Sequence, residues 1–357
     1  MGKHESGFGS NDDIKLAING NKVITYSRAV DVILSRVCRN SCGYCGFAKK
    51  KEKLLVPYST ISIFKKARKL GAREASLISG ERPDKYNYIS AKFDVWGFNS
   101  YMEYIYTVAE LAFLEGLLVN LNIGYLSFNE MKYLQEIAAS LEITLESIGN
   151  NDLAGVHKFS PSKSTNVRLK FLENTGRLNF PVNTGILIGI GESPEDRMRI
   201  LLDIQKMQEE YGNIQSVKIS TYIPQEGTPS VIKKTAGYDD LLATISLARE
   251  ILPESVDITA PINIFQDIMD LINHGVTDLG QIKVLGDDYL FPDKKYPNLD
   301  TVQETLINNG YELYKRLPIK NNFILSQKYS KKIGQLLDKY KLKLKESSKE
   351  ENFLFAY

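Results

Sequence analysis

The sequence predicts an α/β fold, a TIM-type (β/α) barrel that is complete or partial. Short apolar runs rich in Ile, Val and Leu alternate with amphipathic stretches along most of the 357 residues. This alternation is typical of parallel strands that are each followed by a helix. The apolar fraction is 43%, which is ample for a large core. Since no low-complexity linker divides the chain, we expect one barrel at residues 24–317, an N-terminal extension at 1–23 and a lysine-rich helical tail at 318–357.

In the first half of the barrel, buried-strand patterns alternate with helix signals. Strands are expected at 31–37, 74–79, 117–123 and 143–147. Helices are expected at 59–70, 100–115 and 164–174, and two of them end at Gly71 and Gly176. A further helix begins at a capping box formed by Ser127 and Glu130. A long insert separates the second strand from its helix.

The second half repeats the alternation. Strands are expected at 182–190, 216–222, 255–259 and 277–284, and helices at 194–211, 238–252 and 264–274. The run Ser193-Pro194-Glu195-Asp196 is a strong helix start, because a serine cap, a proline in the first turn and two acids all favour an N-terminus. Residues 300–317 are expected to be helical. The lysine-rich run at 331–351 predicts a solvated helix or a frayed end.

Three cysteines are the most informative residues. Cys38, Cys42 and Cys45 are the only cysteines of the chain, and three and then two residues separate them. Closely spaced thiolates are the standard ligands of four-iron clusters, and three of them would leave the fourth iron without a protein ligand. An open iron can bind a substrate, so this spacing indicates catalysis rather than simple electron carriage.

Two other uses of these cysteines are weaker alternatives. A zinc site normally takes four ligands, and the chain has only three histidines to add, His4, His157 and His274. A disulfide framework needs an even number of cysteines in a secreted protein.

The cysteine run, with Tyr44 before the third cysteine, resembles the radical S-adenosylmethionine (SAM) superfamily. The resemblance implies a barrel of the radical SAM type and one 4Fe-4S cluster on Cys38, Cys42 and Cys45. It also implies that the amino and carboxylate groups of SAM chelate the open iron. One electron would then cleave SAM to methionine and a 5′-deoxyadenosyl radical. The cysteine loop follows the first expected strand, at the barrel end where active sites are built.

The same resemblance assigns further residues to SAM. Ser79-Gly80-Glu81 is similar to the superfamily's Gly-Gly-Glu motif, which binds the SAM amino group, with serine in place of the first glycine. The run at 185–192 is similar to a Gly-x-Ile-x-Gly-x-x-Glu pattern whose apolar side chain flanks adenine. Because this run lacks the third glycine of a dinucleotide motif, a Rossmann site is rejected. The expected SAM-binding residues are Tyr44, Ser79, Gly80, Glu81, Glu146, Ser147, Arg168, Leu187, Gly189 and Glu192.

Three of these assignments have plain structural alternatives. Arg168 would pair bidentately with the SAM carboxylate, and a surface arginine is an equal alternative. Tyr44 is expected to lie against adenine, with loop packing as its alternative. The stretch at 79–81 would otherwise be an ordinary loop.

Longer stretches resemble one family within the superfamily, 7,8-didemethyl-8-hydroxy-5-deazariboflavin synthase, the ring-closing subunit of deazaflavin biosynthesis. They lie at 24–28, 38–47, 79–83, 175–178, 184–197, 211–215 and 227–229, within a resemblance that covers roughly residues 24–310. The resemblance implies a lyase of the carbon–nitrogen type. Its substrate is an adduct of tyrosine's hydroxybenzyl group with a ribityl-aminouracil, which a companion radical SAM synthase supplies. Hydrogen abstraction and ring closure release ammonia, methionine and 5′-deoxyadenosine, and a donor such as ferredoxin or flavodoxin supplies the electron.

The resemblance weakens where the substrate would bind. Residues 220–228 replace the family's Gln-Asn-Phe-Arg-x-Lys-Pro-Gly-Thr, and residues 278–281 replace its Asp-Trp-Gly-Gly. A paralogous radical SAM enzyme with a different substrate is therefore an alternative. The substrate-binding candidates follow the sixth to eighth strands and are Tyr222, Gln225, Asn263 and Asp278. Asp278 and Tyr222 are also the catalytic candidates.

Charge and hydropathy exclude other classes. The formal net charge is +2, so no nucleic-acid partner is expected. No apolar run is long enough to span a bilayer, and the N-terminus has no apolar signal segment, so we expect a cytoplasmic protein without a membrane partner. An iron–sulfur carrier and a metal-stabilised binding module remain as alternatives of other classes. The carrier would not need Glu81 or the run at 185–192, and the module would not need so large a barrel.

Overall fold

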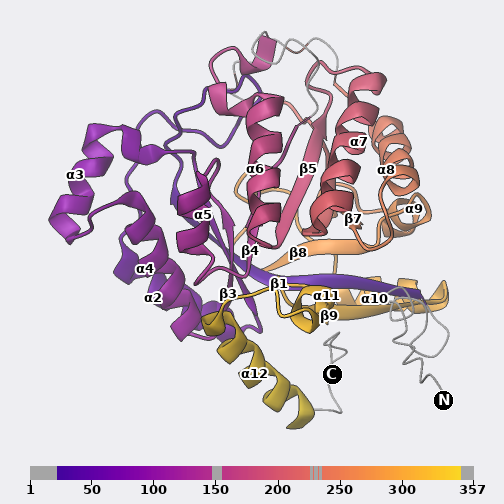
Figure 1. Ribbon diagram of the computed structural model, residues 1–357. Coiled ribbons are helices and arrows are strands. Elements are labelled where there is room, and N and C mark those ends of the chain that lie inside the picture. Colours follow the sequence, from indigo (N-terminus) through magenta and orange to yellow (C-terminus); the bar gives the residue numbers. More distant parts are fainter. Residues whose placement is uncertain (1–21, 147–154, 226–227, 229–231, 233–234, 347–357) are drawn as a thin grey trace, which may run out of the picture.

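The predicted barrel is confirmed by the computed structural model, which describes residues 22–146, 155–225, 228, 232 and 235–346. Its strands form one sheet in the order β7-β6-β5-β4-β3-β2-β1-β8, with all pairings parallel. The amide of Thr277, just before β8, donates to the carbonyl of Ile258 in β7 at 3.1 Å. The two ends of the sheet therefore approach each other, and the barrel is nearly closed (Figure 1).

The strands are β1 Lys22–Ser35, β2 Glu74–Ser79, β3 Leu118–Asn122, β4 Ser140–Glu142, β5 Val182–Ile188, β6 Ile214–Thr221, β7 Asp257–Thr259, β8 Asp278–Leu285 and β9 Tyr311–Arg316. The helices are α2 Pro57–Lys69, α3 Asn87–Trp96, α4 Tyr101–Leu114, α5 Phe128–Leu134, α6 Thr165–Arg177, α7 Pro194–Tyr211, α8 Tyr238–Ile251, α9 Ile268–Asn273, α10 Leu299–Asn308, α11 Asn321–Leu325 and α12 Lys331–Glu346. Short 3-10 turns lie at Pro83–Lys85, Gly155–His157 and Pro161–Lys163.

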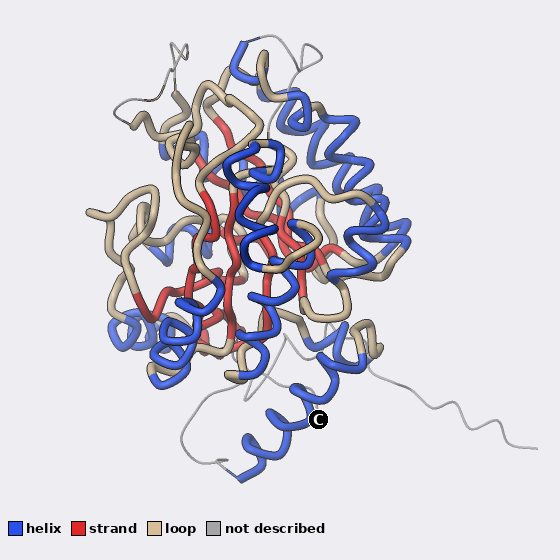
Figure 2. Tube along the Cα trace, turned by 90° about the vertical axis from the view of Figure 1, so that its left-hand side faces the viewer, coloured by secondary structure: helices blue, strands red, loops and turns tan. Residues whose placement is uncertain are grey.

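Helices surround the strands (Figure 2), and one large apolar core joins residues of both. In β6, Val217 and Ile219 are buried in this core, whereas Ser216, Lys218 and Ser220 line a cavity inside the barrel. Alternate side chains of a strand point to opposite faces, so each strand places one set outward and one set inward. The inward set is polar here, although barrel interiors are usually filled by branched apolar residues.

Both helix starts that the sequence predicts in detail are confirmed. Ser127 and Glu130 form a capping box at the start of α5. Ser193 caps α7 through the amide of Asp196, with Pro194 in the first turn. These caps satisfy amide groups that the first turn of a helix leaves without partners.

Several expected elements differ from the structure. The first strand is expected at 31–37, but β1 begins at Lys22 and ends at Ser35. β4 ends at Glu142, before the expected range of 143–147, although its ladder continues as single bonds from Ile143 to Asn183 and from Leu145 to Gly185. Gly176 lies inside α6 rather than after it, where the Tyr211 ring occupies the space of a side chain. The insert after β2 contains α3. Only the first part of 300–317 is helical, because β9 follows α10 and pairs in parallel with β1.

The C-terminal segment covers the end of the barrel where the strands begin. A second apolar cluster joins residues next to the starts of β3 and β4 to the last two helices, and it consists of Leu118, Ala139, Leu317, Ile319, Phe323, Ile324, Ile333, Leu336, Leu337 and Tyr340. Helix α12, which was expected to be solvated, is therefore amphipathic, and its apolar face packs in this cluster. The expected extension up to residue 21 and the tail beyond 346 lie outside the described residues. In the part of the chain that the structure describes, no helix is long and apolar enough to cross a membrane.

Leu337→Ala should lower the free energy of unfolding by about 2–5 kcal/mol, because it removes a fully buried side chain and leaves a cavity. Urea unfolding of the purified protein measures the change. Leu342→Ala on the exposed face of the same helix is the matched control, with an expected change below about 0.5 kcal/mol. Equal effects of the two variants would show that α12 does not pack in solution as described.

Candidate functional site

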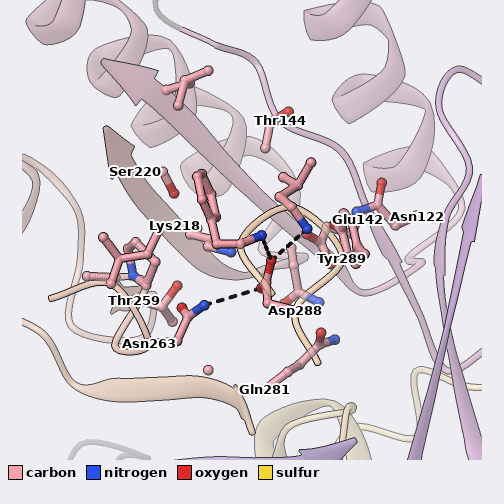
Figure 3. A pocket seen from close by; sticks show the side chains of 18 of the residues that line it. Asn122, Glu142, Thr144, Lys218, Ser220, Thr259, Asn263, Gln281, Asp288 and Tyr289 are labelled. Atoms are coloured by element: carbon pink, nitrogen blue, oxygen red, sulfur yellow. Dashed lines mark hydrogen bonds between the residues drawn. The ribbon is translucent and has the colours of Figure 1, made fainter. Parts of the chain in front are cut away.

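A cavity of about 420 Å³ occupies the barrel interior and opens at the end where the strands finish. Residues from the cysteine loop, from all the described strands β1 to β9 and from the loop after β8 line it. Figure 3 shows how polar side chains from several strands surround this space. In barrels of this type, active sites lie at this end, so we take the cavity as the candidate site.

The cysteine loop follows β1 directly and is packed against the loop after β2. The Cys38 sulfur accepts hydrogen bonds from the amides of Glu81 at 3.2 Å and Asn40 at 3.4 Å. A Cβ on Gly80 would lie 2.2 Å from the carbonyl oxygen of Val37 and 2.9 Å from Cβ of Cys38. Glycine is therefore required at position 80, since only a bare backbone can approach the cysteine loop this closely.

The three thiols fit a four-iron cluster better than a single metal ion. Among the described residues, no group of three or more His, Cys, Asp or Glu side chains is arranged to hold one ion. In a four-iron cluster each thiolate binds a different iron, so the sulfurs need not converge on one point. Burial raises the pKa of Cys38 to about 11, and this proton must leave when a metal binds. Cys38, Cys42 and Cys45 would hold the cluster, and Cys45 also lines the cavity.

Glu81 and Arg168 lie together beside this loop. Arg168 is buried, so it is not a surface arginine, and its Nη2 lies 3.4 Å from Oε2 of Glu81. That oxygen also accepts a hydrogen bond from the amide of Tyr125 at 3.1 Å. The other carboxylate oxygen, Oε1, lies 3.4 Å from Nε of Arg39 and accepts no hydrogen bond from any described residue. A buried acceptor of this kind is costly without a donor, and an amino group such as that of SAM would supply one.

A second charged group flanks the cavity at Glu146, where the backbone has a positive φ of 62°. The Lys163 ammonium and the Thr144 hydroxyl both donate to its Oε1. Burial alone would raise the pKa of Glu146, but the ion pair with Lys163 lowers it to about 2. The carboxylate is therefore charged at neutral pH. Ser147, its expected neighbour in SAM binding, lies outside the described residues.

Tyr44 points its hydroxyl at His157, and Oη and Nε2 share a hydrogen bond of 3.0 Å. The two rings meet edge to face, and the Lys163 ammonium lies 5.9 Å from the centre of the tyrosine ring. Burial and the nearby Glu146 carboxylate raise the pKa of Tyr44 well above its usual value. Tyr44 lines the cavity as a neutral, hydrogen-bonded ring, which suits contact with a flat base.

Leu187 at the end of β5 and Glu192 in the loop after β5 have different roles in the structure. Leu187 lines the cavity, as contact with adenine requires. Glu192 has a fully buried side chain that accepts hydrogen bonds from the amides of Gly189 and Ile190 and pairs with Arg197 at 2.9 Å. Glu192 therefore fixes the shape of this loop and does not line the cavity. Ser79, the last residue of β2, does line the cavity, and its hydroxyl accepts a hydrogen bond from Tyr101.

Three of the four substrate candidates line the cavity, namely Tyr222, Gln225 and Asn263. The Tyr222 hydroxyl is buried and has no hydrogen-bond partner among the described residues. Asn263 donates to Asp288 at 3.3 Å, and Gln225 donates to the carbonyl of Leu290 at 2.8 Å.

Asp278 lies elsewhere. It is the first residue of β8, at the closed end of the barrel, and it does not line the cavity. Its carboxylate is fully buried and accepts hydrogen bonds from Arg316 at 2.5 and 2.8 Å and from Thr25. With these partners, Asp278 is placed to close the barrel and not to contact a ligand in the cavity.

Comparison with known proteins decides the family. The model of the radical SAM superfamily matches residues 32–204. A 7,8-didemethyl-8-hydroxy-5-deazariboflavin synthase from Archaeoglobus fulgidus is 35% identical over 320 residues, which are 89% of this chain and 97% of that protein. A synthase of the same name from Methanosarcina barkeri is 34% identical over 88% of this chain and 96% of its own. The chain belongs to the 7,8-didemethyl-8-hydroxy-5-deazariboflavin synthase family.

Solved structures support the fold of this synthase family member. The FeFe-hydrogenase maturase HydG from Carboxydothermus hydrogenoformans has a TM-score of 0.62 at 18% identity, over 82% of this chain and 68% of its own. Methylornithine synthase has a TM-score of 0.60 at 19% identity, over 83% and 84%. Radical SAM enzymes use a 4Fe-4S cluster and SAM, which confirms the expected cofactors. The alternative of a paralogue with another substrate is not favoured by the synthases found.

Several residues of the synthase site carried no motif. Lys163 and His157 contact Glu146 and Tyr44 from the loop that follows β4, at positions that no strand or helix pattern marks. Glu142 and Lys218 line the cavity from β4 and β6. A signal for Lys218 does exist, since polar residues at 216, 218 and 220 alternate with buried apolar ones.

Arg168→Ala should weaken SAM binding about tenfold or more, because a charge-assisted hydrogen bond is worth about 1.5–3 kcal/mol. Equilibrium dialysis of SAM with the anaerobically reconstituted protein measures the change. Arg177→Ala, in the exposed last turn of the same helix, is the control and should leave the affinity unchanged. An unaltered SAM affinity in Arg168→Ala would remove Arg168 from the SAM site.

Lys163→Met should lower the free energy of unfolding at pH 7 by about 3 kcal/mol, because it leaves the Glu146 charge buried without its partner. The pKa of Glu146 is depressed in the folded protein, so the stability that it contributes is present above about pH 4.5 and is lost as the pH falls toward 2. The gap between wild type and variant should therefore narrow as the pH falls below about 4.5 in urea titrations. Lys170→Met, which breaks the exposed pair with Glu173, is the control and should cost less than about 1 kcal/mol.

Proposed function

We propose that the protein closes the ring of 7,8-didemethyl-8-hydroxy-5-deazariboflavin from an adduct of tyrosine's hydroxybenzyl group with a ribityl-aminouracil. The observation that carries the proposal is the 35% identity to a synthase of that name over 97% of the synthase's length. The reaction is a carbon–nitrogen lyase reaction that releases ammonia. Bound to the chain, the cofactors would supply the 5′-deoxyadenosyl radical that abstracts hydrogen from the adduct, which yields methionine and 5′-deoxyadenosine.

The residues that we assign to the cofactors come from the loops after β1, β2 and β4, from strand β5 and from helix α6. Cys38, Cys42 and Cys45 would ligate the cluster. The orphaned Oε1 of Glu81 would accept from the SAM amino group, and the buried Arg168 would hold its carboxylate. Tyr44, Leu187 and the Glu146 carboxylate lie on the cavity side of these groups, where the nucleoside of SAM would extend.

The substrate would enter beside this group and face Tyr222 and Asn263. The buried Tyr222 hydroxyl lacks a partner among the described residues and would donate to, or accept from, the uracil or phenol of the adduct. The Asn263 amide already holds Asp288 and has an amide oxygen to offer. A small-molecule substrate of this size suits a cavity of about 420 Å³.

Two protein partners belong to the proposal. A companion radical SAM synthase would supply the adduct, and a low-potential donor such as ferredoxin or flavodoxin would reduce the cluster. A reducing compartment such as the cytoplasm suits a chain with free thiols.

Anaerobic incubation of the reconstituted protein with SAM, dithionite and the adduct should give deazaflavin fluorescence and one 5′-deoxyadenosine per product. Cys45→Ala should abolish both, because two thiolates hold the cluster poorly. If the wild type cleaves SAM and gives no deazaflavin, ring closure is the wrong assignment. If a Cys45→Ala protein keeps cluster absorbance and SAM cleavage, the ligand assignment is wrong.

A further inference from the structure

The cavity continues well below the proposed cofactor residues, toward the closed end of the barrel. Along β6, the side chains of Ser216, Lys218, Ser220 and Tyr222 all line it. A strand rises about 3.3 Å per residue, so Lys218 lies roughly 13 Å deeper along the strand than Tyr222. Leu187 pairs with Ser220 in the β5–β6 register, whereas Lys218 pairs with Gly185. Lys218 is thus below the level at which SAM would lie.

Lys218 differs from the other basic residues of the cavity lining, which are Lys283 and Arg316. Lys283 is paired with Asp31, and Arg316 with Asp278. The Lys218 side chain is exposed to the cavity and has no ion pair or hydrogen bond to any residue that the structure describes. Gly185 makes room for it, because a Cβ there would lie 2.4 Å from the Lys218 carbonyl oxygen and 3.1 Å from its Cβ.

Glu142 is the corresponding acid. It pairs with Asn183 in the β4–β5 register, one layer below Lys218, and lines the same cavity. Its Oε2 accepts a hydrogen bond from the Asn120 amide at 3.1 Å, and no cation among the described residues forms an ion pair with it. Figure 3 shows Glu142 and Lys218 among the polar side chains around this space. The other polar lining residues at this depth are Asn122, Thr144, Asn183, Ser216 and Thr259.

An anion and a cation that line one cavity without forming an ion pair do not stabilise the fold. They leave charge in a partly enclosed space without the partner that would offset its desolvation. A ligand that both donates and accepts hydrogen bonds would satisfy the two groups together. A phosphate or carboxylate would be attracted by Lys218 but repelled by Glu142. An amine would be attracted by Glu142 but repelled by Lys218. A neutral chain of hydroxyl groups fits both, because each hydroxyl donates one hydrogen bond and accepts up to two.

We propose that this deep part of the cavity holds the ribityl chain of the substrate, with Glu142 and Lys218 as its main contacts. The inference rests on the proposed function and adds the orientation of the substrate. The aromatic ring system lies near Tyr222 and the cofactors, and the polyol descends into the barrel. The unpaired Glu142 carboxylate accepts from ribityl hydroxyls, and the Lys218 ammonium donates to them. These two residues set specificity for the chain and take no part in breaking or forming bonds.

The test measures binding of the fluorescent product and of an analogue that carries a methyl group in place of ribityl. Both are titrated into the reconstituted holoenzyme with methionine and 5′-deoxyadenosine present. The wild type should prefer the ribityl compound at least about tenfold. Lys218→Met and Glu142→Gln should each weaken ribityl binding about tenfold, the effect of one charge-assisted hydrogen bond, and should change methyl binding less than about twofold.

The controls separate this effect from a loss of fold. Lys206→Met and Glu209→Gln alter the same residue types on the exposed face of α7 and should change neither affinity. Lys218→Arg keeps the donors and should retain most of the preference for ribityl. The ratio of the two affinities is internal to each variant, so a smaller folded fraction does not change it.

Equal weakening of both ligands in Lys218→Met and Glu142→Gln would place these residues against the ring system and overturn the proposal. A wild type that binds both ligands equally would also overturn it. If the wild type binds neither compound but still cleaves SAM, the proposed ring closure itself fails, and the ribityl assignment fails with it.

Discussion

The alternation of side chains along the strands of the barrel is the constraint on which the site depends. Apolar residues such as Val217 and Ile219 face the helices and form the core, while their neighbours face a polar interior. A barrel filled with branched side chains would be more stable but would leave no room for a substrate. In this chain the outer core supplies the stability, and the interior is left open for binding. The cost is a set of polar groups in the barrel that need partners.

At the closed end of the barrel those partners come from the chain itself. Arg316, from the added strand β9, holds Asp278, and Ser27 and Gln281 donate to Glu74. Burial still raises the pKa of Glu74, in spite of the nearby Arg316 guanidinium. These side chains therefore find their partners within the protein. Higher in the barrel, Lys218 and the Tyr222 hydroxyl have no hydrogen-bond partner among the described residues, and Glu142 has the Asn120 amide but no cation. These groups are therefore free to bind a ligand.

The sequence predicts those features of the fold and the site that depend on local patterns. Cysteine spacing, the capping box at Ser127 and the alternation of strands and helices are short-range features, and the barrel and the cysteine loop follow from them. Asp278 shows where this fails. A polar residue next to an apolar strand can lie at either end of it, and β8 begins at Asp278 rather than ending near it. The partner that decides its role, Arg316, lies 38 residues further along the chain. The pairing of β9 with β1 and the contact of Lys163 with Glu146 are likewise long-range or lie in loops, where no periodicity marks a residue.

The loops around the cavity mouth connect the cysteine loop to the substrate side. Phe47, two residues after Cys45, packs edge to face against Tyr289 with ring centres 5.4 Å apart. Gln225, after β6, donates to the carbonyl of Leu290 in the same loop. Asp288 accepts from the amides of Leu290 and Phe291 and from Asn263, so this loop is held by its own turn and by the loop after β7. One set of packed side chains therefore joins the cysteine run to the loops after β6, β7 and β8 at the mouth of the cavity.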